Sequence, residues 1–222
     1  NPKAFIELRA ELEALGHSFR TRSDTEVLLQ AYLAWGESCV EHLNGQWAFA
    51  IWDARKGQLF ASRDRMGIRP FYFTTQGGRL LFASEIKCLF ADPAVPRAID
   101  LRALDQIFTS WVIQPPRTFF EGINQLPPGH NLRARGGQLT ITPYFDLSYG
   151  PVDNETGEDA LAEELLALLA DATRIRLRAD VPVGAYLSGG LDSSILTGLV
   201  QREAKERLRT FSVTFEDPEF DE

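Results

Sequence analysis

The sequence predicts an α+β part of antiparallel sheet and helices, followed by the opening of a parallel α/β sheet. Between Gln46 and Arg63, large apolar side chains alternate along the chain on either side of a turn that contains Gly57, and a period of two indicates a β-hairpin. Between Val181 and Val200, an apolar segment of strand length, a Gly/Ser-rich turn and a helical stretch follow one another. A strand, a tight loop and a helix in that order are typical of the start of a parallel sheet.

Two helices are expected before the first hairpin. Apolar residues recur at helical spacing over residues 2–15 and a glycine follows, which predicts a helix that ends there. Residues 17–22 are expected to be extended. Ser23, with Glu26 three residues later, forms a capping-box pattern, in which each side chain satisfies a backbone N–H group at the start of a helix. The second helix is therefore expected to begin near Asp24.

Short strands and helices complete the first part. Apolar runs on both sides of a Gln-Gly-Gly turn predict a second hairpin. The expected elements are this hairpin at 71–84, helices at 85–90 and 101–108, and further short strands at 118–123 and 130–144.

The composition changes at residues 146–157, where Asp, Asn, Ser, Pro and Gly gather, as they do in linkers. A long helix with leucines along one face is expected over 158–177, and a second strand over 209–215, after the helix of the Gly/Ser loop. We therefore expect two domains, residues 1–150 and residues 151–222.

Composition excludes several classes of protein. The chain has 222 residues, a net charge of −8 and no basic stripe, so nucleic acid is not an expected partner. No apolar stretch approaches the roughly 20 residues that span a membrane, and no signal-like segment opens the chain. Cys39 and Cys88 lack metal-binding spacing and are expected to be buried thiols in a reducing compartment. These observations predict a cytoplasmic protein and leave its oligomeric state open, a homodimer included.

The segment Ser188-Gly189-Gly190-Leu191-Asp192-Ser193-Ser194 has the composition of an anion site. Glycines let successive N–H groups converge, serines add donors, and a helix N-terminus favours negative charge. The lysine of the G-x-x-x-x-G-K-[ST] loop is absent. Asp192 is instead a carboxylate, which suits a polyphosphate when the two share Mg²⁺. The structural alternative is a Gly/Ser turn that caps a helix.

These residues carry a family resemblance. The Ser188–Ser194 loop resembles the pyrophosphate loop of the N-type ATP pyrophosphatases, and the preceding 179–187 is similar to the glutamine-dependent asparagine synthetases. Taken alone, residues 63–72 form a charged connection in which Arg63 and Asp64 pair locally. Yet four strings resemble the glutaminase domain of the same family in order and spacing; they are residues 23–27, 63–72, 82–87 and 126–130. The resemblance covers residues 5–222.

The resemblance implies both a fold and an activity. The first domain would be a class II, N-terminal-nucleophile hydrolase-like glutaminase, and the second the N-terminal part of an ATP-pyrophosphatase domain. The implied reaction makes asparagine from aspartate, ATP and glutamine-derived ammonia through a β-aspartyl-adenylate, with AMP and pyrophosphate released and Mg²⁺ as the metal.

Site residues follow from the same resemblance. Asp24 would bind the ammonium of glutamine, because a zwitterionic substrate needs a fixed negative charge. Asp192 would bind Mg²⁺. Leu187 and Val213 would contact adenine. The pyrophosphate contacts would come from Ser188, Gly189, Gly190, Ser193 and Ser194.

The sequence departs from the family pattern at its ends. The nucleophilic Cys, the glutamine-carboxylate arginine loop and the Asn-Gly oxyanion donors would all precede residue 5, where Asn1-Pro2-Lys3-Ala4 matches none of them. No catalytic residue is therefore assigned, since Cys39 and Cys88 lack a free α-amine. The chain is expected to be truncated at both ends and inactive alone, with the acceptor-acid residues beyond Glu222. A β-lactam-synthetase-type cyclase and an inert regulatory remnant are the alternatives.

Overall fold

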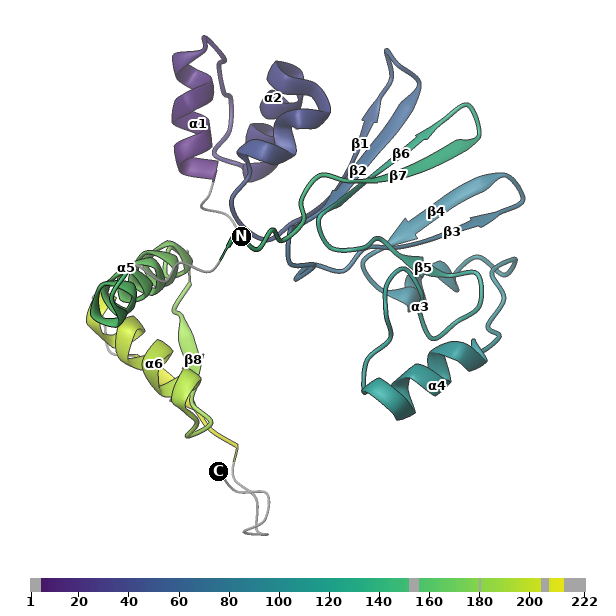
Figure 1. Ribbon diagram of the computed structural model, residues 1–222. Coiled ribbons are helices and arrows are strands. Elements are labelled where there is room, and N and C mark those ends of the chain that lie inside the picture. The colour runs from purple at the N-terminus through teal and green to yellow at the C-terminus, as the bar shows by residue number, and fades with distance from the viewer. Residues whose placement is uncertain (1–4, 152–155, 180, 205–207, 214–222) are drawn as a thin grey trace. The chain divides into compact units, whose positions relative to one another are not determined.

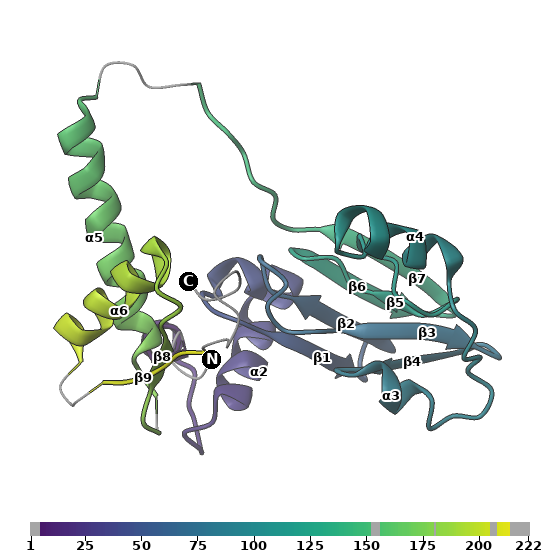
Figure 2. The ribbon, with the colours of Figure 1, turned by 90° about the horizontal axis from the view of Figure 1, so that it is seen from below.

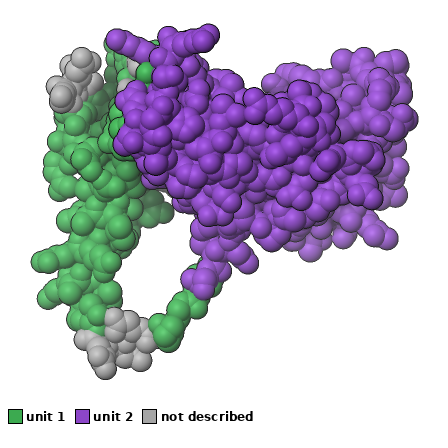
Figure 3. All heavy atoms as spheres, turned by 90° about the horizontal axis from the view of Figure 1, so that it is seen from above, with its two compact units in different colours: residues 1–10, 149–222 green, residues 11–148 purple. Residues whose placement is uncertain are grey.

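The computed structural model describes residues 5–151, 156–179, 181–204 and 208–213 (Figure 1). The chain divides into two compact units (Figure 3). Residues 11–148 form one unit, and residues 1–10 with 149–222 form the other. The division into domains 1–150 and 151–222 stays a prediction.

Helices and two antiparallel sheets make up the unit of residues 11–148 (Figures 1 and 2). Its helices are the end of α1 (Phe5–Ala14), then α2 (Asp24–Trp35), the 3-10 helix η1 (Gly36–His42), α3 (Ile86–Leu89) and α4 (Leu101–Ser110). Its strands are β1 (Ala48–Asp53), β2 (Gln58–Arg63), β3 (Tyr72–Gln76), β4 (Arg79–Ala83), β5 (Asn124–Gln125), β6 (His130–Arg135) and β7 (Gln138–Pro143).

The strands form a four-stranded sheet in the order β1-β2-β6-β7 and a three-stranded sheet in the order β4-β3-β5. Both predicted hairpins are confirmed, with Ile51 opposite Phe60 in one and Phe73 opposite Phe82 in the other. The turns of β1/β2, β6/β7 and β3/β4 lie at the same end of the two sheets (Figure 1). Antiparallel sheet with helices is thus the architecture that the sequence predicts for this part.

The core lies between the two sheets and beneath the helices that flank them. Alternation along each strand directs one face inward, and buried residues from β2, β3 and β6 meet in one cluster, Ala61, Phe73 and Leu132 among them. On the other face of the four-stranded sheet, Tyr32 of α2 stacks on Phe60 at 5.7 Å between ring centroids. The helices and sheets are therefore layered.

The strand predicted at 118–123 is wrong. This segment makes only single bridges to other parts of the chain, and the strand that pairs with β3 is the following β5. The hydroxyl of Thr118 accepts from the backbone N–H of Phe120 at 3.2 Å and donates to the carbonyl of Ile123 at 2.7 Å. Because the side chain closes a turn of its own backbone, the segment curls instead of extending.

Asp64 anchors the connection between β2 and β3. Its carboxylate is 1% exposed and accepts backbone N–H groups from Trp47 at 3.3 Å, Met66 at 3.2 Å, and Ile68 and Arg69 at 2.9 Å. A buried charge is tolerated when hydrogen bonds replace its water. Asp64 therefore holds the whole loop in one conformation.

Arg63 binds backbone carbonyl groups, whereas Asp64 binds backbone N–H groups. Its guanidinium donates to the carbonyls of Arg69 at 2.8 Å, Gly67 at 2.7 Å and Leu126 at 2.6 Å. Burial lowers the pKa of Arg63, and the nearby Asp64 charge opposes that shift. The local Arg63–Asp64 ion pair expected from the sequence is wrong, because both side chains bind the backbone around them.

The loop between β2 and β3 lies so close to Pro128 that only glycine fits at position 67. Gly67 has a φ of +65°, and a Cβ there would lie 2.7 Å from Cγ of Pro128. Residues 63–72 and 126–130, two of the strings that carry the family resemblance, therefore pack against one another.

The unit of residues 1–10 and 149–222 opens a parallel sheet. It contains α5 (Glu158–Arg176), β8 (Gly184–Tyr186), α6 (Leu191–Glu203) and β9 (Arg209–Phe211). Strands β8 and β9 pair in parallel with Ala185 opposite Thr210, which confirms the predicted strand, loop, helix and strand. The last residues of the strand predicted at 209–215 lie outside the described residues.

Removing the carboxylate of Asp64 tests the anchor. We expect Asp64→Ala to lower the free energy of unfolding by about 3–5 kcal/mol, because four backbone N–H groups lose their acceptor and the buried Arg63 charge loses a nearby opposite charge. Urea denaturation of the 222-residue chain measures this change. The exposed Asp105→Ala on α4 serves as control, with an expected change within about 0.5 kcal/mol; similar losses in both variants would contradict the anchoring role.

Candidate nucleotide and glutamine sites

The predicted phosphate loop lies between the end of β8 and the start of α6. Gly189 has a φ of +99°, a conformation that glycine adopts without strain. Gly190 is the N-cap of α6, and no side chain caps the helix. The backbone N–H groups of the first turn of α6 are therefore available to an anion.

The serines of the loop lie together. Oγ of Ser188 lies 3.1 Å from Oγ of Ser193, which also accepts the backbone N–H of Ser188 at 3.3 Å. The hydroxyls of Ser193 and Ser194 donate to the carbonyl of Gly190 at 3.0 and 2.9 Å. Three hydroxyl groups are thus gathered around one helix N-terminus.

Leu187 and Val213 follow the two parallel strands, at the edge where both strands end. The N–H of Leu187 donates to the carbonyl of Phe211 at 2.9 Å, and the hydroxyl of Ser212 donates to the carbonyl of Leu187 at 2.6 Å. Leu187 is partly buried, whereas Val213 is 71% exposed. Ligands of open α/β sheets bind at this carboxyl edge.

Asp192 lies in the first turn of α6 and is exposed. Within the described residues, no group of three or more His, Cys, Asp or Glu side chains could hold a metal ion. A single carboxylate beside an anion site fits the way Mg²⁺ binds, with one or two carboxylates and the phosphates of the substrate.

Asp24 is the first residue of α2, exposed at the helix N-terminus. Its Oδ1 receives only long contacts, from the hydroxyls of Ser23 at 3.5 Å and Thr25 at 3.4 Å. Among the residues that the structure describes, no cation pairs with it. The carboxylate is therefore accessible to an ammonium group.

Only the Ser23 half of the capping box predicted around Asp24 forms. Oγ of Ser23 accepts the backbone N–H of Thr25 at 3.2 Å, as an N-cap does. Glu26 does not return to Ser23. Its carboxylate accepts the backbone N–H groups of Arg20 at 2.8 Å and Thr21 at 2.7 Å. The sequence did not reveal this contact, because a Glu three residues after Ser23 can accept either the N–H of Ser23 or N–H groups of the preceding loop.

The two cysteines differ in environment. Cys39 is buried, and this burial, with a smaller contribution from the charge of Glu37, raises the pKa of its thiol to about 12. Cys88 is exposed, so the expectation of a buried thiol is wrong for this residue. It directly follows Lys87 within the short helix α3.

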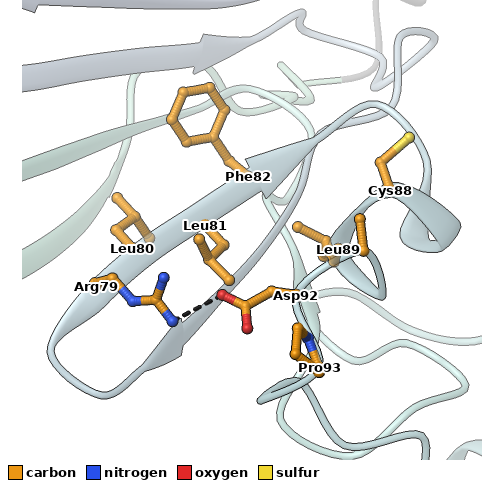
Figure 4. Close-up of a pocket in the computed structure, with 9 residues that line it drawn as sticks. Arg79, Leu80, Leu81, Phe82, Cys88, Leu89, Asp92 and Pro93 are labelled. Atoms are coloured by element: carbon orange, nitrogen blue, oxygen red, sulfur yellow. Dashed lines mark ion pairs between the residues drawn. The ribbon is translucent and has the colours of Figure 1, made fainter.

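Cys88 lies at the rim of a surface pocket of about 700 Å³ beside β4 and α3 (Figure 4). An ion pair between Arg79 and Asp92 at 2.7 Å spans it, and Leu81 and Leu89 form part of its wall (Figure 4). None of the residues predicted for glutamine, ATP or Mg²⁺ lines this pocket.

Over the described ranges, no helix has both the length and the apolar content needed to cross a membrane.

The cysteines provide a test of these environments. A thiol reagent such as Ellman's reagent at pH 8 is expected to titrate one thiol per native chain, Cys88, and a second only in denaturant. Burial and the raised pKa of Cys39 leave roughly a thousandfold less thiolate there than at an ordinary cysteine. Cys88→Ser should abolish the rapid reaction of the native chain with the reagent. Two fast thiols in the native chain would contradict the burial of Cys39.

Comparison with known proteins agrees with the order of the two parts of the chain. Residues 4–145 match the family described as glutamine amidotransferase domain, and residues 164–222 match the family described as asparagine synthase. The first match agrees with the glutamine amidotransferase domain expected for the antiparallel part. The second covers the Ser188–Ser194 loop.

Three curated proteins illustrate the similarity. Asparagine synthetase [glutamine-hydrolyzing] 3 of Bacillus subtilis is 41% identical and is matched over 95% of this chain and 35% of its own length. Asparagine synthetase [glutamine-hydrolyzing] 1 of the same organism is 40% identical over 98% of this chain and 34% of its own length. Amidase chry2 of Gibberella zeae is 40% identical over 85% and 28%.

The chain thus spans about a third of the length of the curated relatives that it matches. Both family models fall in the order that the sequence predicts. By the first of these matches, which covers more than half of the chain, the chain belongs to the family described as glutamine amidotransferase domain.

Proposed function

We propose that this chain serves the ATP-dependent synthesis of asparagine from aspartate, with ammonia released from glutamine. The observation that carries the proposal is the uncapped N-terminus of α6, where Gly190 precedes exposed N–H groups and three serine hydroxyls gather. The asparagine synthetase names of its relatives support aspartate as the acceptor in preference to a cyclase substrate.

The loop would act on the leaving group of ATP. The carboxylate of aspartate attacks the α-phosphorus, an acyl-adenylate forms, and the bond to the β-phosphate breaks. N–H groups of the first turn of α6 and the hydroxyls of Ser188, Ser193 and Ser194 hold the pyrophosphate that departs, because they neutralise its charge. The hydroxyls of Ser193 and Ser194 must turn away from Gly190 to do so. Ammonia then attacks the acyl carbon, and AMP leaves.

Adenine and metal would be held at the same edge of the parallel sheet. Leu187 and Val213 follow adjacent strands and offer apolar surface for the base. Asp192 would hold Mg²⁺, which supplies charge neutralisation to the phosphates when it is bound.

The unit of residues 11–148 would supply the ammonia. Asp24 offers an exposed carboxylate at the start of α2 that pairs with no cation among the described residues, and we propose that it binds the ammonium of glutamine. Neither cysteine carries a free α-amine that could serve as base, so no residue of this chain is proposed as the nucleophile. Both cysteines are unpaired thiols, and we propose a cytoplasmic setting in which they stay reduced.

The metal role of Asp192 is tested by ATP–pyrophosphate exchange in the full-length gene product that carries this chain. Asp192→Asn should lower the exchange that depends on aspartate and Mg²⁺ by at least about tenfold, because the amide keeps the volume and loses the metal ligand. Asp159→Asn is the matched control, since Asp159 also lies in the first turn of an exposed helix, α5. Undiminished exchange in the Asp192 variant would refute the metal role.

The glutamine role of Asp24 separates two activities of the same enzyme. In the full-length gene product, Asp24→Asn should raise KM for glutamine by at least about tenfold, because the substrate ammonium loses its counter-charge. Synthesis driven by added ammonia should stay near normal. Asp105→Asn, an exposed acid on α4, should change neither activity. Equal losses in both activities of the Asp24 variant would mean that Asp24 only stabilises its helix.

A further inference from the structure

The segment between α1 and α2 is held along α2 at two points. Nδ1 of His17 lies 2.8 Å from Oε1 of Gln30 in the middle of α2. Nearer the helix start, the carboxylate of Glu26 accepts the backbone N–H groups of Arg20 and Thr21 at 2.8 and 2.7 Å, together with the hydroxyl of Thr21. One side chain thus ties down two consecutive residues of the loop.

The Thr21 hydroxyl extends this clamp to the helix cap. While it donates to Glu26, its oxygen accepts the backbone N–H of Ser23 at 3.2 Å. Oγ of Ser23 in turn accepts the N–H of Thr25 at 3.2 Å. The backbone on both sides of Asp24 is therefore fixed by a chain of hydrogen bonds that begins at Glu26.

Asp24 itself has little that would orient it. The two contacts to its Oδ1, at 3.5 and 3.4 Å, are at or near the limit of a hydrogen bond. Its side chain has only two torsions, so the position of its backbone limits the region that the carboxylate can occupy. The position of that backbone depends on the loop that Glu26 clamps.

We infer that Glu26 is a positioning residue for glutamine, which acts through Thr21 and Ser23 to hold the Asp24 carboxylate where the substrate ammonium binds. The inference rests on the proposed function of Asp24. Loss of the clamp frees the loop from residue 20 to 23, so part of the binding energy is then used to order it.

The test is a double-mutant cycle in the full-length gene product. Glu26→Ala should raise KM for glutamine about five- to tenfold and leave ammonia-driven synthesis unchanged. In the Asp24→Asn background the same change should have less than about a twofold effect, because a residue that acts through Asp24 has nothing left to position. Thr21→Val, which keeps the shape and removes the relay hydroxyl, should raise KM in the same direction by a smaller factor.

A matched control separates positioning from loss of stability. Asp100 caps α4 by accepting the N–H groups of Arg102 and Ala103, and it pairs with Arg117. Asp100→Ala therefore removes a comparable set of contacts at another helix start. It is expected to lower the melting temperature as Glu26→Ala does, without raising KM for glutamine.

The outcomes distinguish the inference from the proposal beneath it. If Asp24→Asn raises KM and Glu26→Ala does not, or if the two effects multiply, Glu26 is not a positioning residue while the role of Asp24 stands. If Asp24→Asn leaves KM unchanged, the proposed glutamine site fails and this inference fails with it.

Discussion

The structure of the unit of residues 11–148 depends on two adjacent charges buried without pairing to each other. Asp64 collects backbone N–H groups and Arg63 collects backbone carbonyls, so one residue pair satisfies both kinds of buried backbone group at the end of β2. Through Leu126 the guanidinium also reaches the segment that leads to β6. Tyr144, just after β7, donates its phenol to the carbonyl of Arg63 at 2.8 Å, and burial raises the pKa of that phenol to about 12. The anchor thereby ties together connections from both sheets.

The two candidate sites use helix N-termini in opposite ways. At α2, Ser23 satisfies a backbone N–H, and the exposed carboxylate of Asp24 faces outward; a capped start with an acidic residue favours a cationic group. At α6 the cap is Gly190, which has no side chain to offer, and the unsatisfied N–H groups favour an anion. The two proposed sites thus differ in whether the N-cap side chain satisfies a backbone N–H of the first turn, while each has an acidic residue at the helix start.

In the proposed glutamine site, the Thr21–Glu26 clamp is a set of contacts that would act on the ligand without touching it. Glu26 lies on α2, one helical turn along from Ser23, and its acceptor oxygens face back toward the preceding loop. A carboxylate is suited to this task because it can accept several N–H and O–H groups at once. A loop with three such contacts enters the helix at a fixed angle, which is what a directional ammonium site requires.

Sequence alone determined the features that follow from local periodicity and glycine conformation. The hairpins of 46–63 and 71–84, the Gly/Ser loop with its helix and the parallel strand that follows could all be predicted, because alternation and Gly/Ser turns are properties of neighbouring residues. Tertiary structure decided the rest. Whether Glu26 returns to Ser23 or reaches Thr21, whether Arg63 binds Asp64 or the backbone, and whether Cys88 is buried depend on groups that the fold brings close. The curl at 118–123 has a local cause in the side chain of Thr118, but its attachment to β3, where the carbonyl of Gly122 accepts from Thr74 at 2.7 Å, joins residues 48 positions apart that no local pattern reveals.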